Sequence, residues 1–305
     1  MTCPVSQLPT EPEVSQVSCD VVDRFERVTG SVFLGMFAAA LFDQAMLPEV
    51  SAALEDTGRI RNAPLARGLR TAASDQITFL GGEADRYAEM ERLKTLHRDV
   101  KGVGADGVRY SAMTPVSWNW ILISTFFMHR NALVAITGQR LTLADDQAIW
   151  DRFRQLVDGL QLSGRSRLIE DYAELCAYYD HMVAEKLEVT STLECAVRGL
   201  QLPARPDFVP APVAPLWRLT SPMVGHILVV LGFGIMHADV RALMPMTWTR
   251  RHDVEFAALA TGIRLAYRWL PARITDTPLA RNRREYQRLM KKYRGIGLTS
   301  FAPGR

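Results

Sequence analysis

A histidine on an apolar helix stripe is the residue best placed to do chemistry in this sequence. The segment Glu83–Lys101 has helical periodicity, and Met90, Leu93, His97 and Val100 recur along it at 3-4-3 spacing. This spacing puts the imidazole on the face that packs against a core, so we predict that His97 is buried. Burial lowers the pKa of an imidazole and keeps it neutral, which is the form that binds a metal ion. A core histidine without a catalytic role is the alternative.

Two lysines flank this histidine. Lys94 lies three residues before His97 and Lys101 four residues after it, so both share its side of a continuous helix. Positive neighbours lower the pKa of an imidazole further. Cations beside a buried histidine need an anionic group to compensate them, so the pattern favours a site that receives a negatively charged ligand or cofactor.

A second cationic set precedes the histidine on a helix predicted over Leu65–Leu80. Arg67, Arg70 and Thr71 share one face of this helix through i, i+3 and i+4 spacing. Two guanidinium groups and a hydroxyl near a buried metal can donate hydrogen bonds to bound dioxygen, to peroxide or to carboxylates. A solvated arginine face is the alternative.

A second histidine, His129, ends the apolar run Trp118–Met128 and is followed by Arg130. We expect both polar side chains to reach the surface or to meet an anionic group. Several large apolar side chains are suited either to a substrate cavity or to the core: Trp118, Trp120, Phe127 and Phe233.

Three motifs in order resemble a known family. They are Arg67-Gly-Leu-Arg70-Thr71, then His97-Arg-Asp-Val100-Lys-Gly102, then Tyr110-Ser-Ala112-Met-Thr-Pro115. In this order and at these separations they resemble the rubber oxygenase (latex clearing protein) and mpaB-type oxygenase family. The resemblance is densest over about Gly35–Thr125 and continues more weakly through Tyr179–Leu200 and Leu243–Arg284.

The resemblance implies an all-helical protein that binds haem b through one histidine, and it makes His97 the proximal iron ligand. It places Arg67, Arg70 and Thr71 near the oxygen-binding position, and it makes Lys94 and Lys101 candidates for contact with the haem propionates. His129 is a further candidate, because it ends the apolar run Trp118–Met128. Arg70 stands where rubber oxygenases carry a lysine. Because an arginine is a poor iron ligand, the resemblance implies neither coordination by this side chain nor cleavage of polyisoprene.

The function expected from these residues is that of a haem b-dependent oxidoreductase or oxygenase. It would use dioxygen or peroxide to oxidise an apolar or aromatic small molecule, and secondary metabolism is one setting for such a reaction. A non-catalytic haem-binding or helical interaction protein is the alternative from another class. A cofactor-free helical protein, in which His97 belongs to the core, is a third interpretation.

The elements that must position these residues are helices. No region shows the apolar and polar alternation of a strand, whereas helical periodicity recurs along the chain. We therefore predict an all-α fold, with a single large domain of about ten or more helices that encloses the haem pocket. The domain is expected over residues 19–295, with a flexible arm at 1–18 and a tail at 296–305.

Composition excludes several classes of protein. The net charge of +3 is too small to indicate a nucleic-acid partner. The four cysteines include no CxxC pair, so neither a zinc site nor a disulfide framework is expected, and the cytoplasm is the predicted location. The oligomeric state is left open.

Two further segments concern membranes. The apolar runs Trp118–Met128 and Pro222–Met236 are shorter than the roughly 20 residues that span a bilayer, so we predict buried core helices and no transmembrane segment. The segment Arg281–Arg294 holds seven basic residues against a single glutamate. It is typical of a solvated helix face, and weak contact with an anionic lipid surface is the alternative.

Overall fold

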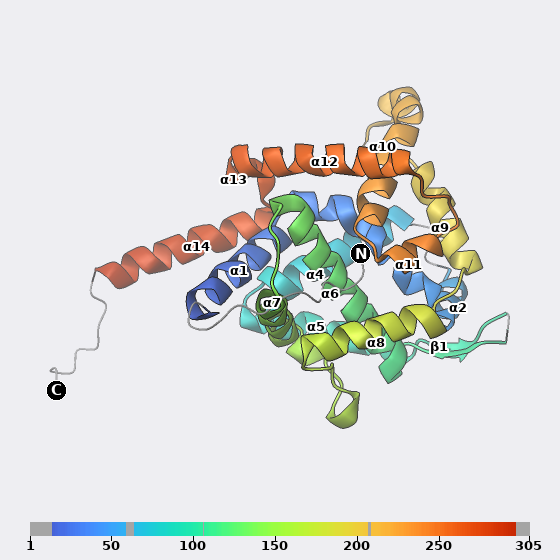
Figure 1. Cartoon of the computed structure of the whole chain (residues 1–305), viewed down its shortest axis with the longest axis horizontal. Coiled ribbons are helices and arrows are strands. Elements are labelled where there is room, and N and C mark those ends of the chain that lie inside the picture. Colours follow the sequence, from blue (N-terminus) through green and yellow to red (C-terminus); the bar gives the residue numbers. More distant parts are fainter. Residues whose placement is uncertain (1–13, 59–63, 106, 207–208, 297–305) are drawn as a thin grey trace.

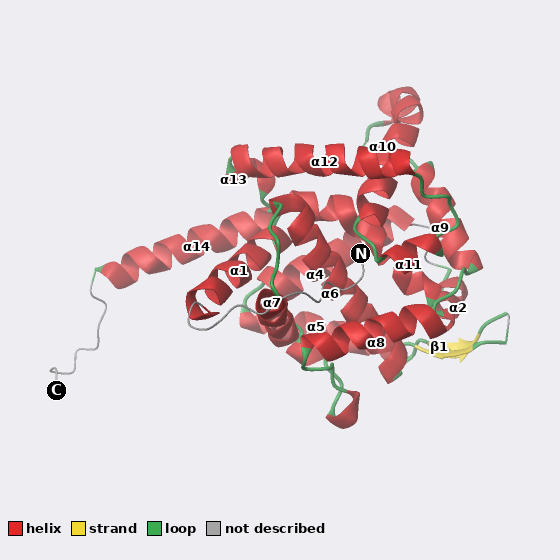
Figure 2. Ribbon diagram, viewed as in Figure 1, coloured by secondary structure: helices red, strands yellow, loops and turns green. Residues whose placement is uncertain are grey.

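The computed structural model describes residues 14–58, 64–105, 107–206 and 209–296. Over these residues the chain is mostly helical, with one short β hairpin, which confirms the predicted all-α class (Figures 1 and 2). Helix α1 already begins at Val14, so the last part of the predicted arm is helical. The rest of the arm and residues 297–305 of the tail lie outside the described residues.

The elements follow one another in this order in the first half of the chain: α1 (Val14–Thr29), the 3-10 helix η1 (Val32–Met46), α2 (Pro48–Asp56), α4 (Pro64–Leu80), α5 (Glu83–Arg98), β1 (Lys101–Val103), β2 (Arg109–Ser111) and α6 (Pro115–Thr137). The second half contains α7 (Leu143–Leu156), η2 (Asp158–Leu160), η3 (Gly164–Ser166), α8 (Tyr172–Glu185), α9 (Ser191–Gln201), η4 (Ala211–Val213), α10 (Ala214–Gly234), α11 (Ala238–Ala242), α12 (Arg250–Trp269), α13 (Ala272–Thr275) and α14 (Pro278–Gly295).

Helix α6 is the centre of the core. Pro115 stands in its first turn, where the missing N–H costs no hydrogen bond, and Gly138 ends it in the left-handed conformation with φ 72°. Trp120, Phe126 and Leu133 on this helix are buried completely. Helices α1, α12 and η1 pack around α6, so its apolar character is explained by burial inside the protein.

The helices that contain the two apolar runs are longer than the runs themselves. Helix α6 has 23 residues, and η4 with α10 forms a helical stretch of 24 residues, so both are long and apolar enough to cross a membrane by length and composition. The bent pair η1 and α2 would add a third candidate span. The predicted short length was therefore wrong, whereas the absence of a transmembrane segment stays a prediction. The two helices differ in burial, because 61% of the apolar window of α6 is buried but only 39% of the other.

A β hairpin follows α5, where the sequence pattern predicted more helix. Helix α5 ends at Arg98, and the antiparallel strands β1 and β2 pair Lys101 with Ser111 and Gly102 with Tyr110. A Cβ atom on Gly102 would lie 2.7 Å from the hydroxyl oxygen of Tyr110. The glycine therefore lets the tyrosine ring lie across the hairpin.

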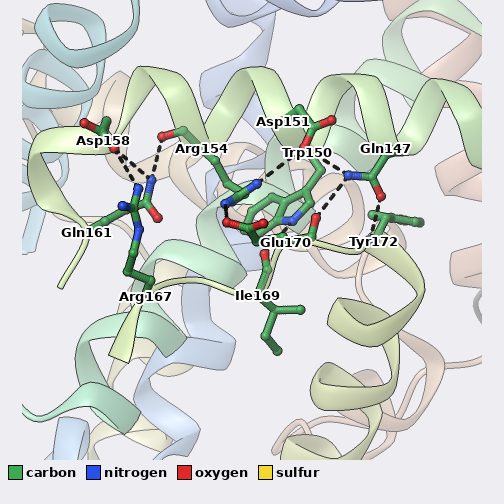
Figure 3. Close-up of polar contacts among 10 residues, drawn as sticks. All are labelled: Gln147, Trp150, Asp151, Arg154, Asp158, Gln161, Arg167, Ile169, Glu170 and Tyr172. Atoms are coloured by element: carbon green, nitrogen blue, oxygen red, sulfur yellow. Dashed lines mark hydrogen bonds and ion pairs between the residues drawn. The ribbon is translucent and has the colours of Figure 1, made fainter. Parts of the chain in front are cut away.

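Polar contacts hold the long connection between α7 and α8 against α7 (Figure 3). The Trp150 indole N–H donates to the carbonyl oxygen of Ile169 at 3.0 Å, and Arg154 pairs with Glu170 at 2.8 Å. The Gln147 side chain donates to the Glu170 carbonyl at 3.0 Å and accepts from the Tyr172 N–H at 2.7 Å. These contacts satisfy backbone groups that a loop would otherwise leave to solvent.

Two further features bear on earlier expectations. Cys176 is disulfide-bonded, which the cysteine spacing did not predict, whereas Cys195 is free. Helix α14 extends away from the body, and its basic side chains Arg288, Lys291 and Lys292 are exposed (Figure 1). Weak membrane contact through this helix stays a prediction.

Candidate functional site

The antiparallel pair α4 and α5 brings the two predicted sets of site residues to one end. The Ser74 hydroxyl on α4 donates to the Glu89 carboxylate on α5 at 2.5 Å, and one turn closer to the α4–α5 turn Arg86 donates to the Thr78 carbonyl at 2.9 Å. Because the two helices run antiparallel, earlier residues of α4 lie beside later residues of α5. The segment 67–71 of α4 therefore lies level with the last turns of α5, which hold His97.

His97 lies in the last turn of α5 and is half-buried. Its stripe faces inward as predicted, since Met90 is buried and Leu93 packs against the core. Full burial of the imidazole was nevertheless predicted wrongly, because α5 ends one residue later and contacts the core along a narrow side only. Its ring meets the buried Trp118 edge-on, with centroids 5.6 Å apart.

A hydrogen bond sets the tautomer of this imidazole. The Nδ1 atom of His97 lies 2.8 Å from the backbone carbonyl oxygen of Leu93. A carbonyl oxygen can only accept, so Nδ1 carries the proton in this contact and the neutral ring keeps its lone pair on Nε2. This arrangement is typical of metal-binding histidines, whose second nitrogen is held by a backbone carbonyl or a carboxylate.

The lysines predicted beside His97 have other positions. Lys94 is half-buried on α5 and forms an ion pair with Glu91 one turn earlier. Lys101 is exposed on β1 and pairs with Ser111 across the hairpin. The prediction that Lys101 shares the helical side of His97 was wrong, because the helix ends at Arg98.

The arginine and threonine set lies on α4. Arg70 and Thr71 are exposed, and the side chain of Arg67 lies outside the described residues. Gly68 between them has open space around it, with no atom within 4 Å of an added Cβ. The structure thus brings Arg70, Thr71 and His97 to the same end of the α4–α5 pair and leaves that end accessible.

His129 belongs to the core and not to this end. It is 1% exposed and lies between Phe79 and Phe25, with ring centroids 4.9 and 6.4 Å away. The expectation that it reaches the surface was therefore wrong. Trp118, which contacts His97, lies eleven residues before His129 on the same helix. Eleven residues correspond to about 16 Å along the helix axis. Burial lowers the pKa of His129 to about 4, so the ring stays neutral at physiological pH.

Two sets of hydrogen bonds between hydroxyl and carboxyl groups were not predicted from the pattern. Asp43 is buried on η1, where it accepts from the Ser124 hydroxyl at 2.6 Å and from the Tyr179 hydroxyl at 3.3 Å. Burial raises its pKa to about 7, and these hydrogen bonds offset part of the effect. The signal in the sequence was a lone acid inside the apolar run 32–46. Near the hairpin, the Tyr110 hydroxyl donates to Asp56, which raises the pKa of the phenol.

A described cavity lies elsewhere in the molecule. It has a volume of about 630 Å³ and is formed by the α4–α5 turn, the end of α7 and the start of α14, with Arg86, Arg152 and Arg283 in its wall. Arg86 and Arg283 donate to carbonyl oxygens at the C-terminal end of α4. These arginines therefore satisfy backbone acceptors that a helix end leaves open.

The donor set fits a cofactor that brings its own ligands. Among the described residues, no group of three or more His, Cys, Asp or Glu side chains could hold a metal ion. Haem brings most of the ligands of its iron itself, so the protein would need to add only one side chain. A single histidine such as His97, with its lone pair on Nε2, meets that requirement.

The fold is all-helical, and comparison with known proteins gives its family. The family model described as "ER-bound oxygenase mpaB/B'/Rubber oxygenase, catalytic domain" matches residues 26–265, and the chain belongs to this family. The chain is 22% identical over 218 residues to the uncharacterized proteins Mb2261 of Mycobacterium bovis and Rv2237 of Mycobacterium tuberculosis. This match covers 72% of the present chain and 80% of each relative. No solved structure matches the chain significantly.

Proposed function

We propose that this oxygenase binds haem b through His97 and oxidises an apolar or aromatic small molecule with dioxygen or peroxide. The observation that carries the proposal is the contact between His97 Nδ1 and the Leu93 carbonyl at 2.8 Å, which directs the lone pair to Nε2. Membership of the oxygenase family supports the reaction class. Haem iron, when bound, supplies the redox centre at which oxygen is activated.

The protein side chains have separate tasks in this proposal. The Leu93 carbonyl holds the imidazole of His97, and Trp118 limits its rotation from the side. The Trp118 ring is itself fixed, because its indole N–H donates to the carbonyl oxygen of Leu160 at 2.7 Å. An imidazole that is held in this way loses little conformational entropy when it becomes a ligand.

The polar groups on the neighbouring helix would have a different task. Arg67, Arg70 and Thr71 would offer hydrogen-bond donors, and the two arginines positive charge, to an oxygen substrate. A guanidinium group has N–H donors and no acceptor, so Arg70 would act as a hydrogen-bond donor. Lys94 and Lys101 remain the candidates for pairing with the propionates.

Optical spectroscopy of the purified protein tests the iron ligand. Wild-type protein reconstituted with haem b is expected to show a Soret band of bound haem, and His97→Ala is expected to lose the bound haem. His226→Ala is the matched control, since that histidine is half-exposed and pairs with Glu255 on the far α10–α12 side. If wild type and His97→Ala bind equal amounts of haem, His97 is not the iron ligand.

A second measurement separates an oxygenase from a haem carrier. Reduced haem in an oxygenase keeps an accessible position for carbon monoxide, so the Soret band is expected to shift when the gas is added. Consumption of dioxygen with apolar test substrates would then follow. A reduced protein that neither binds carbon monoxide nor turns over any substrate supports the non-catalytic haem-binding interpretation.

A further inference from the structure

Helix α12 presents an uncovered apolar stripe to solvent. Val254, Ala258, Thr261, Leu265 and Trp269 recur at 4-3-4-4 spacing and are all exposed, with 74% of Trp269 accessible. All but Thr261 are apolar, and the Thr261 hydroxyl donates to the carbonyl oxygen of Ala257. The opposite side of α12 packs on α6 and α10. The stripe therefore lies on the outside of the molecule and is about 22 Å long. Ile274 on α13, which is 53% exposed, continues it.

The start of helix α10 adds a second apolar surface beside the first. Figure 1 shows the first turns of α10 standing above α12 at one end. Leu216, Leu219 and Met223 in these turns are exposed, and Leu219 is the most accessible large apolar side chain among the described residues, at 79%. Contacts between α10 and α12 hold the two helices together. Exposed apolar patches of this extent mark interaction sites in soluble proteins.

The charges on these two helices are mostly positive: the only acidic residues of α12 are Asp253, whose carboxylate accepts from the Trp248 indole N–H, and Glu255. The sequence contains no Asp or Glu over residues 209–238 or 256–275. The exposed charged residues within these ranges include Arg218 on α10, Arg268 on α12 and Arg273 near α13. Glu255, on the flank of the stripe, is already paired with Arg251 and His226. The partner of this face must therefore accept apolar side chains and supply negative charge.

An anionic membrane meets both requirements better than a second copy of the chain. A twofold contact would bring the same patch of each subunit together, so the arginines of one patch would face those of the other. A bilayer surface with acidic lipids offers hydrocarbon to the leucines and negative headgroups to the arginines. Tryptophan is the side chain most typical of the boundary between these layers, and the Arg268 guanidinium lies 5.5 Å from the Trp269 ring centroid.

We propose that the face formed by the first turns of α10 and the outer stripe of α12 docks the protein on an anionic lipid membrane. The start of α10 enters the acyl region with Leu216, Leu219 and Met223. Helix α12 lies in the headgroup layer with Trp269 at its end. The rest of α10 stays packed in the protein, where Val229, Val230 and Leu231 are buried, so the docking does not require a spanning helix.

Vesicle flotation tests this proposal. Purified full-length protein is mixed with vesicles of phosphatidylcholine alone, or with about 30 mol% phosphatidylglycerol, whose negative surface attracts arginines. We expect flotation with the anionic vesicles, and a decrease of binding when salt is raised. Leu219→Glu and Trp269→Glu should each reduce the bound fraction about tenfold, because each places a carboxylate at the apolar layer. Absence of flotation in wild type overturns the proposal.

Val103→Glu is the matched control. Val103 is 59% exposed on β1, far from the proposed face (Figure 1), so this variant should bind vesicles like wild type. The circular dichroism melting curves of the variants should match that of wild type, because each change is at the surface. Light scattering is measured in parallel. If wild type forms a dimer that Leu219→Glu dissociates, while no variant alters flotation, the face is a self-association surface and the proposal is wrong.

Discussion

Two buried ionisable side chains give this protein opposite responses to pH. Burial raises the pKa of Asp43 to about 7 and lowers the pKa of His129 to about 4. The folded state thus holds the proton of Asp43 more tightly than the unfolded state and the proton of His129 less tightly. Asp43 lowers stability as pH rises from about 4 to about 7, whereas His129 lowers stability as pH falls below about 6.5. The pH dependence of stability measured on wild type alone therefore combines the effects of Asp43 and His129.

Asp43→Asn separates the aspartate from the histidine. The amide does not titrate and can still accept a hydrogen bond from Ser124, so the variant avoids an ionised group in the core. We expect it to gain stability relative to wild type as pH rises, by up to about 4 kcal/mol above pH 7. Urea unfolding at several pH values measures the difference. Asp23→Asn, at an exposed site on α1, is the control. If the free energy of unfolding changed with pH in the same way in wild type and Asp43→Asn, the raised pKa of Asp43 would be contradicted.

At the scale of elements, the backbones of α10 and η1 lie in close contact at Gly232. A Cβ atom on Gly232 would lie 2.4 Å from the Cβ of Ala39 and 3.0 Å from its backbone. Glycine at this position lets the two helices touch, and its neighbours Leu231 and Phe233 are buried. The contact fixes the part of α10 behind the proposed membrane face.

Gly232→Ala is expected to destabilise the protein by about 1–3 kcal/mol, because Ala39 and the backbone of η1 must move to admit the methyl group. Gly199→Ala is the matched control on α9, where an added Cβ has no atom within 4 Å. This second variant should be more stable than wild type by about 0.5–1 kcal/mol, since alanine loses less entropy in a helix. Urea denaturation compares the two. A smaller loss for Gly232→Ala than for an ordinary surface change would show that the interface adapts.

At the scale of the whole molecule, cofactor binding should be visible in stability. His97, the proposed iron ligand, lies at the accessible end of the α4–α5 pair. Its ring contacts the core residue Trp118. A ligand that binds only the folded state stabilises it by about 2.7 kcal/mol at a hundred times its dissociation constant. For a chain of this size we expect the melting temperature to rise by roughly 5 °C with saturating haem.

The same titration with His97→Ala should give little rise, and iron-free protoporphyrin should give a smaller rise than haem with wild type. Differential scanning fluorimetry or circular dichroism measures these shifts. An equal rise for wild type and His97→Ala would mean that haem binds without a bond to this histidine. A rise with iron-free porphyrin as large as that with haem would lead to the same conclusion.

The sequence by itself determined the helical class and the inward side of α5, because periodicity reports which residues share a face. The order of the three motifs indicated the family that the family model confirms. Tertiary structure decided where α5 stops and how Lys101 enters a hairpin, since strand pairing with Ser111 needs a partner distant in sequence. It also decided that His129 lies among phenylalanines of other helices. Which apolar residues remain uncovered, as on α10 and α12, depends on neighbours that a local pattern does not contain.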